Sequence, residues 1–237
     1  MANKLWDKGF KEDERIDAFT VGNDRELDHE LAPYDIMGTM AHITMLESVG
    51  LLSKEDLDKL LPVLKELYSS ACKGELYVEE DVEDIHSQIE LMLTRRLGDV
   101  GKKVHTGRSR NDQVLVDLKL YARAEIENTV HKVESLFNTL QEASERYKDV
   151  LIPGYTHLQV AMPSSFGLWF GAYAESLCDD LSIMKAAWDV VNLNPLGSAA
   201  GYGSSAPLNR TLTTVLLGFE DLDYNSVYAQ MTRGKME

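Results

Sequence analysis

The stretch DQVLVDLKLYARAEIENTVHKVESLFNTLQEASERY, residues 112–147, contains neither glycine nor proline and decides the fold. Its apolar residues recur at the three- and four-residue spacing of one helix face, at Leu115, Leu118, Ala122, Ile126, Val130, Val133, Phe137, Leu140 and Tyr147. This spacing predicts one helix, about 54 Å long at 1.5 Å per residue. Such a helix is longer than a small domain is wide, so we expect it to pack against other long helices.

A second glycine-poor stretch, residues 163–194, repeats this pattern. Its stripe is rich in aromatic residues, which we interpret as core or subunit contacts: Phe166, Trp169, Phe170, Tyr173, Leu177, Leu181, Met184, Trp188 and Val191. The connection DVLIPGYTHLQVAMP, residues 149–163, joins the two stretches. Its length indicates an antiparallel helix pair.

Shorter helices are predicted on both sides of the pair. One runs from Leu31 or Asp35 to Val49, a second follows Ser53 as its N-cap, and a third covers Asp81 to Leu97. Another is predicted from Pro207 to about Leu217. Because alternating polarity is rare, the fold class is all-α. We expect an N-terminal helical domain over residues 1–111 and a central long-helix bundle over 112–237, cut on its C-terminal side.

Composition excludes several classes of protein. The 237 residues carry a net charge of -15, which argues against nucleic-acid binding. No apolar run reaches the roughly 20 residues of a membrane span, and the N-terminus lacks a signal-peptide core. A cytoplasmic protein is expected. Cys72 and Cys178 lie far apart, so we expect buried free thiols.

Two polar clusters are candidates for binding or catalytic sites. HTGRSRNDQ, residues 105–113, places two arginines in a turn before the long helix, where a local anion site or a solvated loop would both fit. GYTHLQ, residues 154–159, offers a hydroxyl, an imidazole and an amide. A loop histidine suits acid-base chemistry, although these groups could also satisfy helix ends. No histidine has metal-ligand spacing, and no nucleotide-binding motif is present, so no metal and no cofactor are expected.

HTGRSRNDQ before a long helix, PGYTHLQ after it and NPLGSAAGYGSS further on resemble the argininosuccinate lyase family of the fumarase/aspartase superfamily. The resemblance starts near KLWDKGF, includes VEDIHSQIE and covers the chain as the N-terminal portion of a longer enzyme. It implies reversible β-elimination of argininosuccinate to arginine and fumarate, in arginine biosynthesis. It also implies a homotetramer that needs neither cofactor nor metal.

Carried over by motif, the resemblance makes His157 the acid-base residue. It implies substrate contacts by Ser109, Arg110, Asn111, Thr156, His86 and Gln159. Three departures stand out. The family's GSSxMPxKKNP loop with the catalytic serine is absent, and AMP replaces the usual AQP at residues 161–163. The family's N-terminal substrate serine has no clear match in FTVGNDRELD, where Gly22, Asp24 or neither could replace it. His157 could assist the leaving guanidino nitrogen or orient that serine, and the sequence does not separate the two roles.

The predicted helix also bears on how a site is assembled. It separates Asn111 from His157 by about 54 Å, and the connection after it reaches at most about 33 Å. We therefore expect the two clusters to meet only between subunits, and this 237-residue stretch to be inactive alone. Two other hypotheses stay open: a sister lyase acting on adenylosuccinate or another fumarate adduct, and a crystallin-like helical oligomer without activity.

Overall fold

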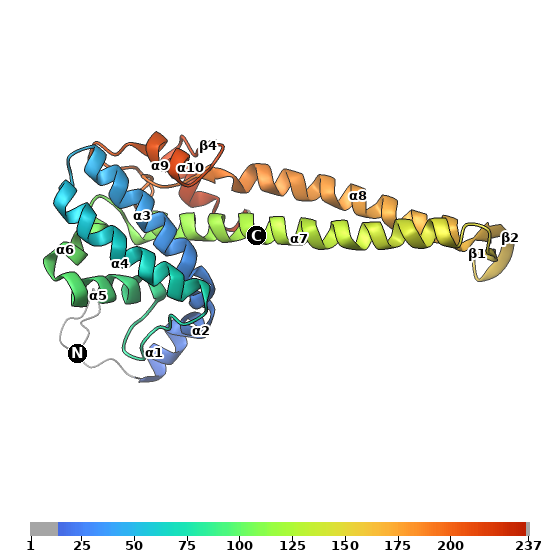
Figure 1. The fold of residues 1–237 in the computed structure, drawn as a ribbon, viewed down its shortest axis with the longest axis horizontal. Helices are drawn as coiled ribbons and strands as arrows, with labels where there is room; N and C mark the ends of the chain where they lie inside the picture. The colour runs from blue at the N-terminus through green and yellow to red at the C-terminus, as the bar shows by residue number, and fades with distance from the viewer. Residues whose placement is uncertain (1–13, 236–237) are drawn as a thin grey trace. The chain divides into compact units, whose positions relative to one another are not determined.

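The computed structural model describes residues 14–235, and the KLWDKGF motif at residues 4–10 lies outside that range. The chain forms two compact units. Unit 1 contains the chain up to Tyr121 and from Asn192 onward, and unit 2 contains Ala122–Val191. Figure 1 shows that both units are built mainly of helices, which confirms the predicted fold class. The predicted domain boundary at residues 111 and 112 is a different division of the chain and stays a prediction.

Unit 1 is a cluster of helices and short connections. In chain order it contains α1 (Glu14–Val21), α2 (Asp24–Leu27), η1 (Asp28–Leu31), α3 (Ala32–Ser48), α4 (Lys54–Cys72), α5 (Ile85–Leu97), α6 (Asp99–Lys102), η2 (Lys103–His105), the start of α7 (Arg110–Arg146), β3 (Leu193–Asn194), α9 (Arg210–Leu216), β4 (Asp221–Leu222), α10 (Ser226–Met231) and η3 (Arg233–Lys235). Strands β3 and β4 form one short parallel pair. The helices predicted near residues 31–49, from residue 53 and over 207–217 are therefore present.

Local capping explains where α4 and α5 begin. The Ser53 side chain accepts a hydrogen bond from the Asp56 backbone N–H at 3.1 Å, as the sequence predicted. Helix α5 begins at Ile85 instead of the expected Asp81, because Asp84 is its N-cap and accepts from Ser87 N–H at 2.6 Å. The acidic residues before Asp84 precede the helix.

The main core of unit 1 lies between α3, α4 and α5. Ile36, Leu60 and Ile85 are fully buried there. A second cluster joins α3 and the start of α7 to the chain after residue 192, through Ala41, Val116, Leu120, Leu196, Leu217 and Phe219. This second cluster holds the first turns of α7 in unit 1.

Unit 2 is an antiparallel helix pair closed by a β-hairpin (Figure 1). Helix α8 (Phe166–Val191) runs back beside the later part of α7. The Arg123 guanidinium lies 5.5 Å from the centre of the Trp188 ring, and Ser144 Oγ donates to the Gly167 carbonyl at 2.7 Å. The predicted antiparallel pair is confirmed. The connection is more regular than predicted, because β1 (Leu151–Thr156) and β2 (Gln159–Ser165) pair along their length.

One side-chain expectation for the helices needs correction. Cys72 and Cys178 are free, as predicted, but both are exposed. The aromatic stripe of α8 is only partly covered by its own unit, since Trp169 remains 48% exposed and Tyr173 52% exposed. Its interpretation as core or subunit contacts stays a prediction.

Replacing Gly167 by alanine should destabilise unit 2. A Cβ atom at this position would lie 2.5 Å from Lys148 Cα and 2.8 Å from the Ser144 carbonyl oxygen. We expect a loss of about 1–3 kcal/mol in the free energy of unfolding, measured by urea denaturation. Gly171→Ala on the same helix is the matched control, because its Cβ would meet only Ser144 Oγ at 3.5 Å. Equal stability of the two variants would contradict this packing argument.

None of the helices in the described residues is long and apolar enough to cross a membrane.

Candidate functional site

The polar run at residues 105–113 caps the start of α7. Ser109 Oγ accepts a hydrogen bond from Asn111 N–H at 3.2 Å, and Asp112 Oδ1 accepts from Ser109 N–H at 2.9 Å. These reciprocal bonds form a capping box, in which both side chains satisfy N–H groups that the first helical turn leaves unpaired. Ser109 and Asp112 thus fix the backbone from which Arg110 and Asn111 project.

Asp112 also fixes a distant loop to this turn. Its second oxygen, Oδ2, accepts from the Gly197 N–H at 2.9 Å and the Ala199 N–H at 3.0 Å. Asp112 is fully buried, and Ala199 holds a positive φ of 53°. One carboxylate therefore joins HTGRSRNDQ to the NPLGSAAGYGSS segment.

Arg110 is held by contacts with two other segments. Its Nη1 donates to Gln113 Oε1 at 3.1 Å and its Nη2 to Ser87 Oγ at 3.2 Å, while Nε lies 3.9 Å from Asp84 Oδ2. The guanidinium is half-buried. Arg110 therefore links the start of α7 to the start of α5, where His86 lies.

The Asn111 side chain differs from those of Ser109 and Arg110 in its hydrogen bonding. It is half-buried, and no other described residue hydrogen-bonds to its amide. An amide carries two donors and one acceptor, so this side chain is free to bind a small molecule.

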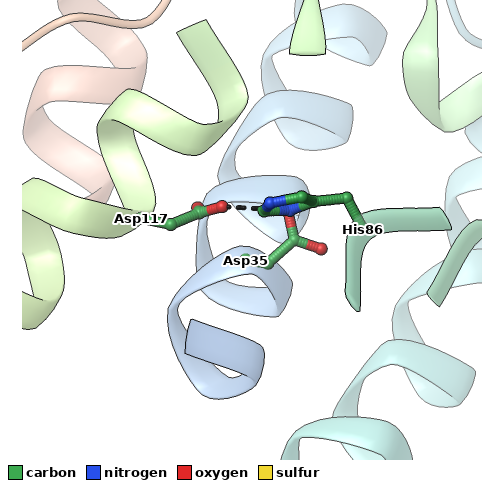
Figure 2. A group of neighbouring side chains, drawn as sticks. All are labelled: Asp35, His86 and Asp117. Carbon is green, nitrogen blue, oxygen red and sulfur yellow. Dashed lines mark hydrogen bonds and ion pairs between the residues drawn. The ribbon is translucent and has the colours of Figure 1, made fainter. Parts of the chain in front are cut away.

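His86 lies between two buried carboxyl groups that come from different helices. Its Nδ1 is 3.2 Å from Asp35 Oδ1 on α3 and 3.3 Å from Asp117 Oδ2 on α7. Figure 2 shows the three side chains directed at one another from α3, α5 and α7. The two aspartates are fully buried and His86 is only 4% exposed. Gln113 Nε2 also donates to Asp35 Oδ1.

The surroundings of Asp35 and Asp117 shift their pKa values in opposite directions. Burial tends to raise the pKa of Asp35, but the His86 hydrogen bond and charge, Arg108 and Gln113 lower that pKa below its ordinary value. Burial and the Asp35 charge raise the pKa of Asp117 well above its ordinary value. Asp117 therefore binds a proton more readily than Asp35 does.

Arg108 supplies the positive charge of this region. It is 8% exposed, its Nη1 donates to Thr39 Oγ1 at 3.0 Å, and its Nε has no hydrogen-bond partner in the described residues. Burial lowers the pKa of Arg108, and the charges of Asp35, Asp117 and Asp112 oppose that shift. The guanidinium thus balances the buried carboxylates.

Two further histidines lie beside Arg108. Burial and the Arg108 charge lower the pKa of His42 to about 3, and the Nε2–H of His42 donates to the Thr106 carbonyl at 2.8 Å. His42 is buried, and this bond satisfies one of its ring nitrogens. Burial, Arg108 and Arg110 lower the pKa of His105 to about 4. Both rings are neutral at pH 7.

His42 should therefore make the stability of unit 1 depend on pH. The unfolded imidazole binds a proton below its ordinary pKa of 6.5 while the folded one stays neutral down to about 3. Stability should fall as pH falls through that window, by up to about 1.4 kcal/mol per pH unit. We expect the loss between pH 7 and pH 5 in urea denaturation to be about 2 kcal/mol smaller in His42→Gln. An unchanged loss in His42→Gln would contradict this assignment, and His131→Gln, at an exposed position, is the control.

The second polar cluster forms the tip of the β-hairpin in unit 2. Thr156 pairs with Gln159, so His157 and Leu158 make a two-residue turn. All four residues are exposed, and the described part of unit 2 offers the His157 imidazole no partner. Both turn residues have positive φ, 51° for His157 and 63° for Leu158.

That backbone conformation is costly for these residue types. Two-residue hairpin turns with two positive φ angles favour Asn-Gly, and a left-handed residue with a side chain costs about 1–2 kcal/mol. Strain of this kind concentrates at functional sites. A histidine and a leucine at these positions therefore favour a role for the tip beyond closing the hairpin.

The predicted site residues fall into two sets. Unit 1 brings together Ser109, Arg110, Asn111 and His86, and unit 2 brings together Thr156, His157 and Gln159. Sequence reasoning missed Asp35, Asp117 and Asp112. One signal was available, because Asp117 lies within the apolar run VLVDLKL, where solvated positions are rare.

Within the described residues, Asp35, His86 and Asp117 are also the one set with metal-ligand character. One ligand atom from each lies within 4.8 Å of the others. A divalent ion prefers such oxygen and nitrogen ligands. Arg108 already neutralises one buried negative charge at this position, which weakens the case for a cation.

Comparisons with known proteins agree with one another. A family model described as "Lyase" matches residues 8–228. An argininosuccinate lyase of Parabacteroides distasonis is 67% identical over the whole chain, which covers 53% of that relative. An EDDS lyase variant with bound fumarate is similar in structure, with a TM-score of 0.75 and 29% identity over 94% of this chain and 44% of that one. A class II fumarase from Schistosoma mansoni shares the fold, with a TM-score of 0.73 and 17% identity over 90% of this chain and 54% of that one.

The chain spans about half the length of the curated relatives it matches.

Proposed function

This chain belongs to the lyase family that its sequence matches over residues 8–228, and we propose that the protein it forms part of is an argininosuccinate lyase. The reaction removes a proton from the carbon beside a carboxylate and breaks the adjacent C–N bond. The electron pair of the C–H bond forms the double bond of fumarate, and the leaving guanidino nitrogen gains a proton to become arginine. The 67% identity to an argininosuccinate lyase carries this proposal.

The groups of unit 1 suit the charge that develops in this reaction. Negative charge grows on the substrate carboxylate as the proton leaves, and fixed donors aimed at that charge lower the barrier. Asn111 supplies an unoccupied amide at the start of α7, where the helix N-terminus also favours anions. Ser109 and Arg110 complete this set, and His86 contacts the substrate from α5.

We assign the acid-base role to His157, with Thr156 and Gln159 as neighbouring substrate contacts. An imidazole titrates near neutral pH, which suits proton transfer at physiological pH. The exposed and strained hairpin tip supports this assignment.

Helix length leads us to propose that active sites are shared between subunits. Helix α7 is continuous over 37 residues, so its ends lie about 55 Å apart. The 11 residues from Tyr147 to His157 reach at most about 36 Å when extended. His157 of one subunit would therefore complete a site begun by Asn111 of another.

We propose a homotetramer as the assembly that brings these groups together. Unit 2 exposes large apolar side chains that water does not favour, including Leu136, Leu168, Trp169, Ile183 and Val190. Packing of such helix pairs against one another would cover them. Sedimentation equilibrium of the full-length protein tests this assembly, and a monomer at micromolar concentration would contradict it.

Fumarate release, followed by ultraviolet absorbance, tests the activity. The full-length protein should release fumarate from argininosuccinate, and residues 1–237 alone should not, because curated relatives are about twice as long. A panel with adenylosuccinate and EDDS distinguishes sister lyases. No fumarate from any of these would favour the crystallin-like hypothesis.

We place this activity in arginine biosynthesis, since arginine is the product, and in the cytoplasm. Two free exposed thiols suit a reducing compartment. The substrate is a small molecule, and we propose no nucleic-acid or membrane partner.

A further inference from the structure

The His86 imidazole is anchored through one of its two ring nitrogens. Among the residues that the structure describes, only Nδ1 has partners, at 3.2 Å from Asp35 Oδ1 and 3.3 Å from Asp117 Oδ2. No hydrogen bond joins Nε2 to any described residue. Helices α3, α5 and α7 each supply one member of the group, so the ring orientation is set by the packing of unit 1 (Figure 2).

The chemistry of these partners determines which nitrogen carries the proton. Both atoms that face Nδ1 are carboxyl oxygens. A bare Nδ1 lone pair would face the lone pairs of Asp35 Oδ1, which already accepts from Gln113 Nε2. Nδ1 must therefore be a donor, and Nε2 is the nitrogen left for other contacts.

Charge balance favours a proton over a metal ion in this cluster. Arg108 is buried beside Asp35 and Asp117, so its positive charge compensates one carboxylate. The second carboxyl group is neutral when it shares a proton with the first, as two adjacent acids do. A divalent cation added to Arg108 and the two carboxyl groups would leave positive charge buried without compensation.

We propose that Asp35 and Asp117 are positioning residues that fix His86 as the Nδ1–H tautomer and leave Nε2 as its substrate-contacting atom. This inference rests on the proposed function only for the identity of the substrate. In the neutral ring Nε2 is a hydrogen-bond acceptor, so it suits an N–H group of the substrate and not a carboxylate. His86 and Asn111 would then recognise different ends of one ligand.

The tautomer can be measured without any turnover. In ¹⁵N-histidine-labelled chain at pH 7.5, two-bond ¹H–¹⁵N spectra distinguish protonated from bare ring nitrogens, and His86→Gln assigns the signal. We expect a protonated Nδ1 and a bare Nε2 for His86. A bare Nδ1, or loss of the Nδ1 proton on addition of Zn²⁺, would overturn the proposal, the second outcome indicating a metal site.

Kinetics of the full-length enzyme test the positioning role separately. Asp117→Leu removes an acceptor, and we expect kcat to fall about 10- to 100-fold, the loss typical of residues that orient a metal-bound histidine. Asp117→Asn keeps an acceptor oxygen and should recover part of that loss. Asp56→Asn, a buried carboxylate of unit 1 that contacts Lys103, is the control. Unchanged kcat in Asp117→Leu would overturn the positioning role.

The ¹⁵N spectra and the kinetics distinguish a failure of this inference from a failure of the proposed function. If the full-length protein does not act on argininosuccinate, the proposed function fails while the tautomer result stands. If Asp117→Leu does not fold, the spectrum of the unaltered chain still decides between a proton and a metal ion.

Discussion

Replacing His157 by asparagine should lower the kcat of the full-length enzyme by about 10²–10⁴-fold, the usual contribution of a general acid or base. Asparagine keeps hydrogen-bonding capacity but cannot exchange a proton near neutral pH. The fold should not change, because the imidazole is exposed at the hairpin tip and contacts nothing in unit 2. Initial rates of fumarate formation at saturating argininosuccinate measure the effect.

A matched control for His157 lies in the same unit. His131 is an exposed histidine of α7, and its nearest charged group is Glu134 at 3.9 Å. His131→Asn should leave kcat unchanged. If His157→Asn retained the full kcat, the acid-base role would belong to another residue.

Replacing Asp112 by alanine should lower the stability of unit 1 substantially. It removes the acceptor for three backbone N–H groups, those of Ser109, Gly197 and Ala199. An unpaired buried donor costs about 1–3 kcal/mol, and these bonds are only partly buried, so we expect a total of about 3 kcal/mol. Urea denaturation of the chain measures the free energy of unfolding.

Hydrogen exchange should locate the damage from Asp112→Ala. Faster exchange of the Gly197 and Ala199 amides would follow from their lost acceptor. Asp99→Ala is the control, because that carboxylate is exposed and its ion pair is with Lys102 at the surface. A stability loss in Asp112→Ala no larger than in Asp99→Ala would show that the carboxylate does not hold the two segments together.

Helical periodicity predicted most of the fold because it reports on burial directly. The long stretch without glycine or proline became α7, and its predicted limits of 112–147 differ little from the observed Arg110–Arg146. Ser53 also marked the start of α4, since caps act through local hydrogen bonds. The start of α5 was misplaced, because several acidic residues competed as the N-cap and only Asp84 receives the Ser87 N–H.

The β-hairpin formed by β1 and β2 was not predicted, and the reason is physical. Its turn uses His157 and Leu158 at positive φ, where the sequence signal for such a turn is Asn-Gly or Asp-Gly. Prolines in both strands further obscured the pairing, although Pro153 and Pro163 lie opposite each other. Histidine and leucine are not typical of such a turn, so the sequence carries no local signal for it.

The candidate site was predictable only in part. Motifs located the exposed and half-buried groups, such as Asn111 and His157. The contacts of Asp35 with His86 and Gln113 join residues that lie 51 and 78 positions away in the chain. No local pattern predicts such pairing, because it arises from the packing of three helices.

Subunit complementation tests the shared-site account most directly. Full-length His157→Asn and Asn111→Ala proteins, each inactive, would be mixed, dissociated in denaturant and reassembled, with each variant taken through the same cycle alone. If one subunit supplies Asn111 and another His157, mixed assemblies contain intact sites and fumarate formation returns. If both groups act within one chain, the mixture stays as inactive as its components.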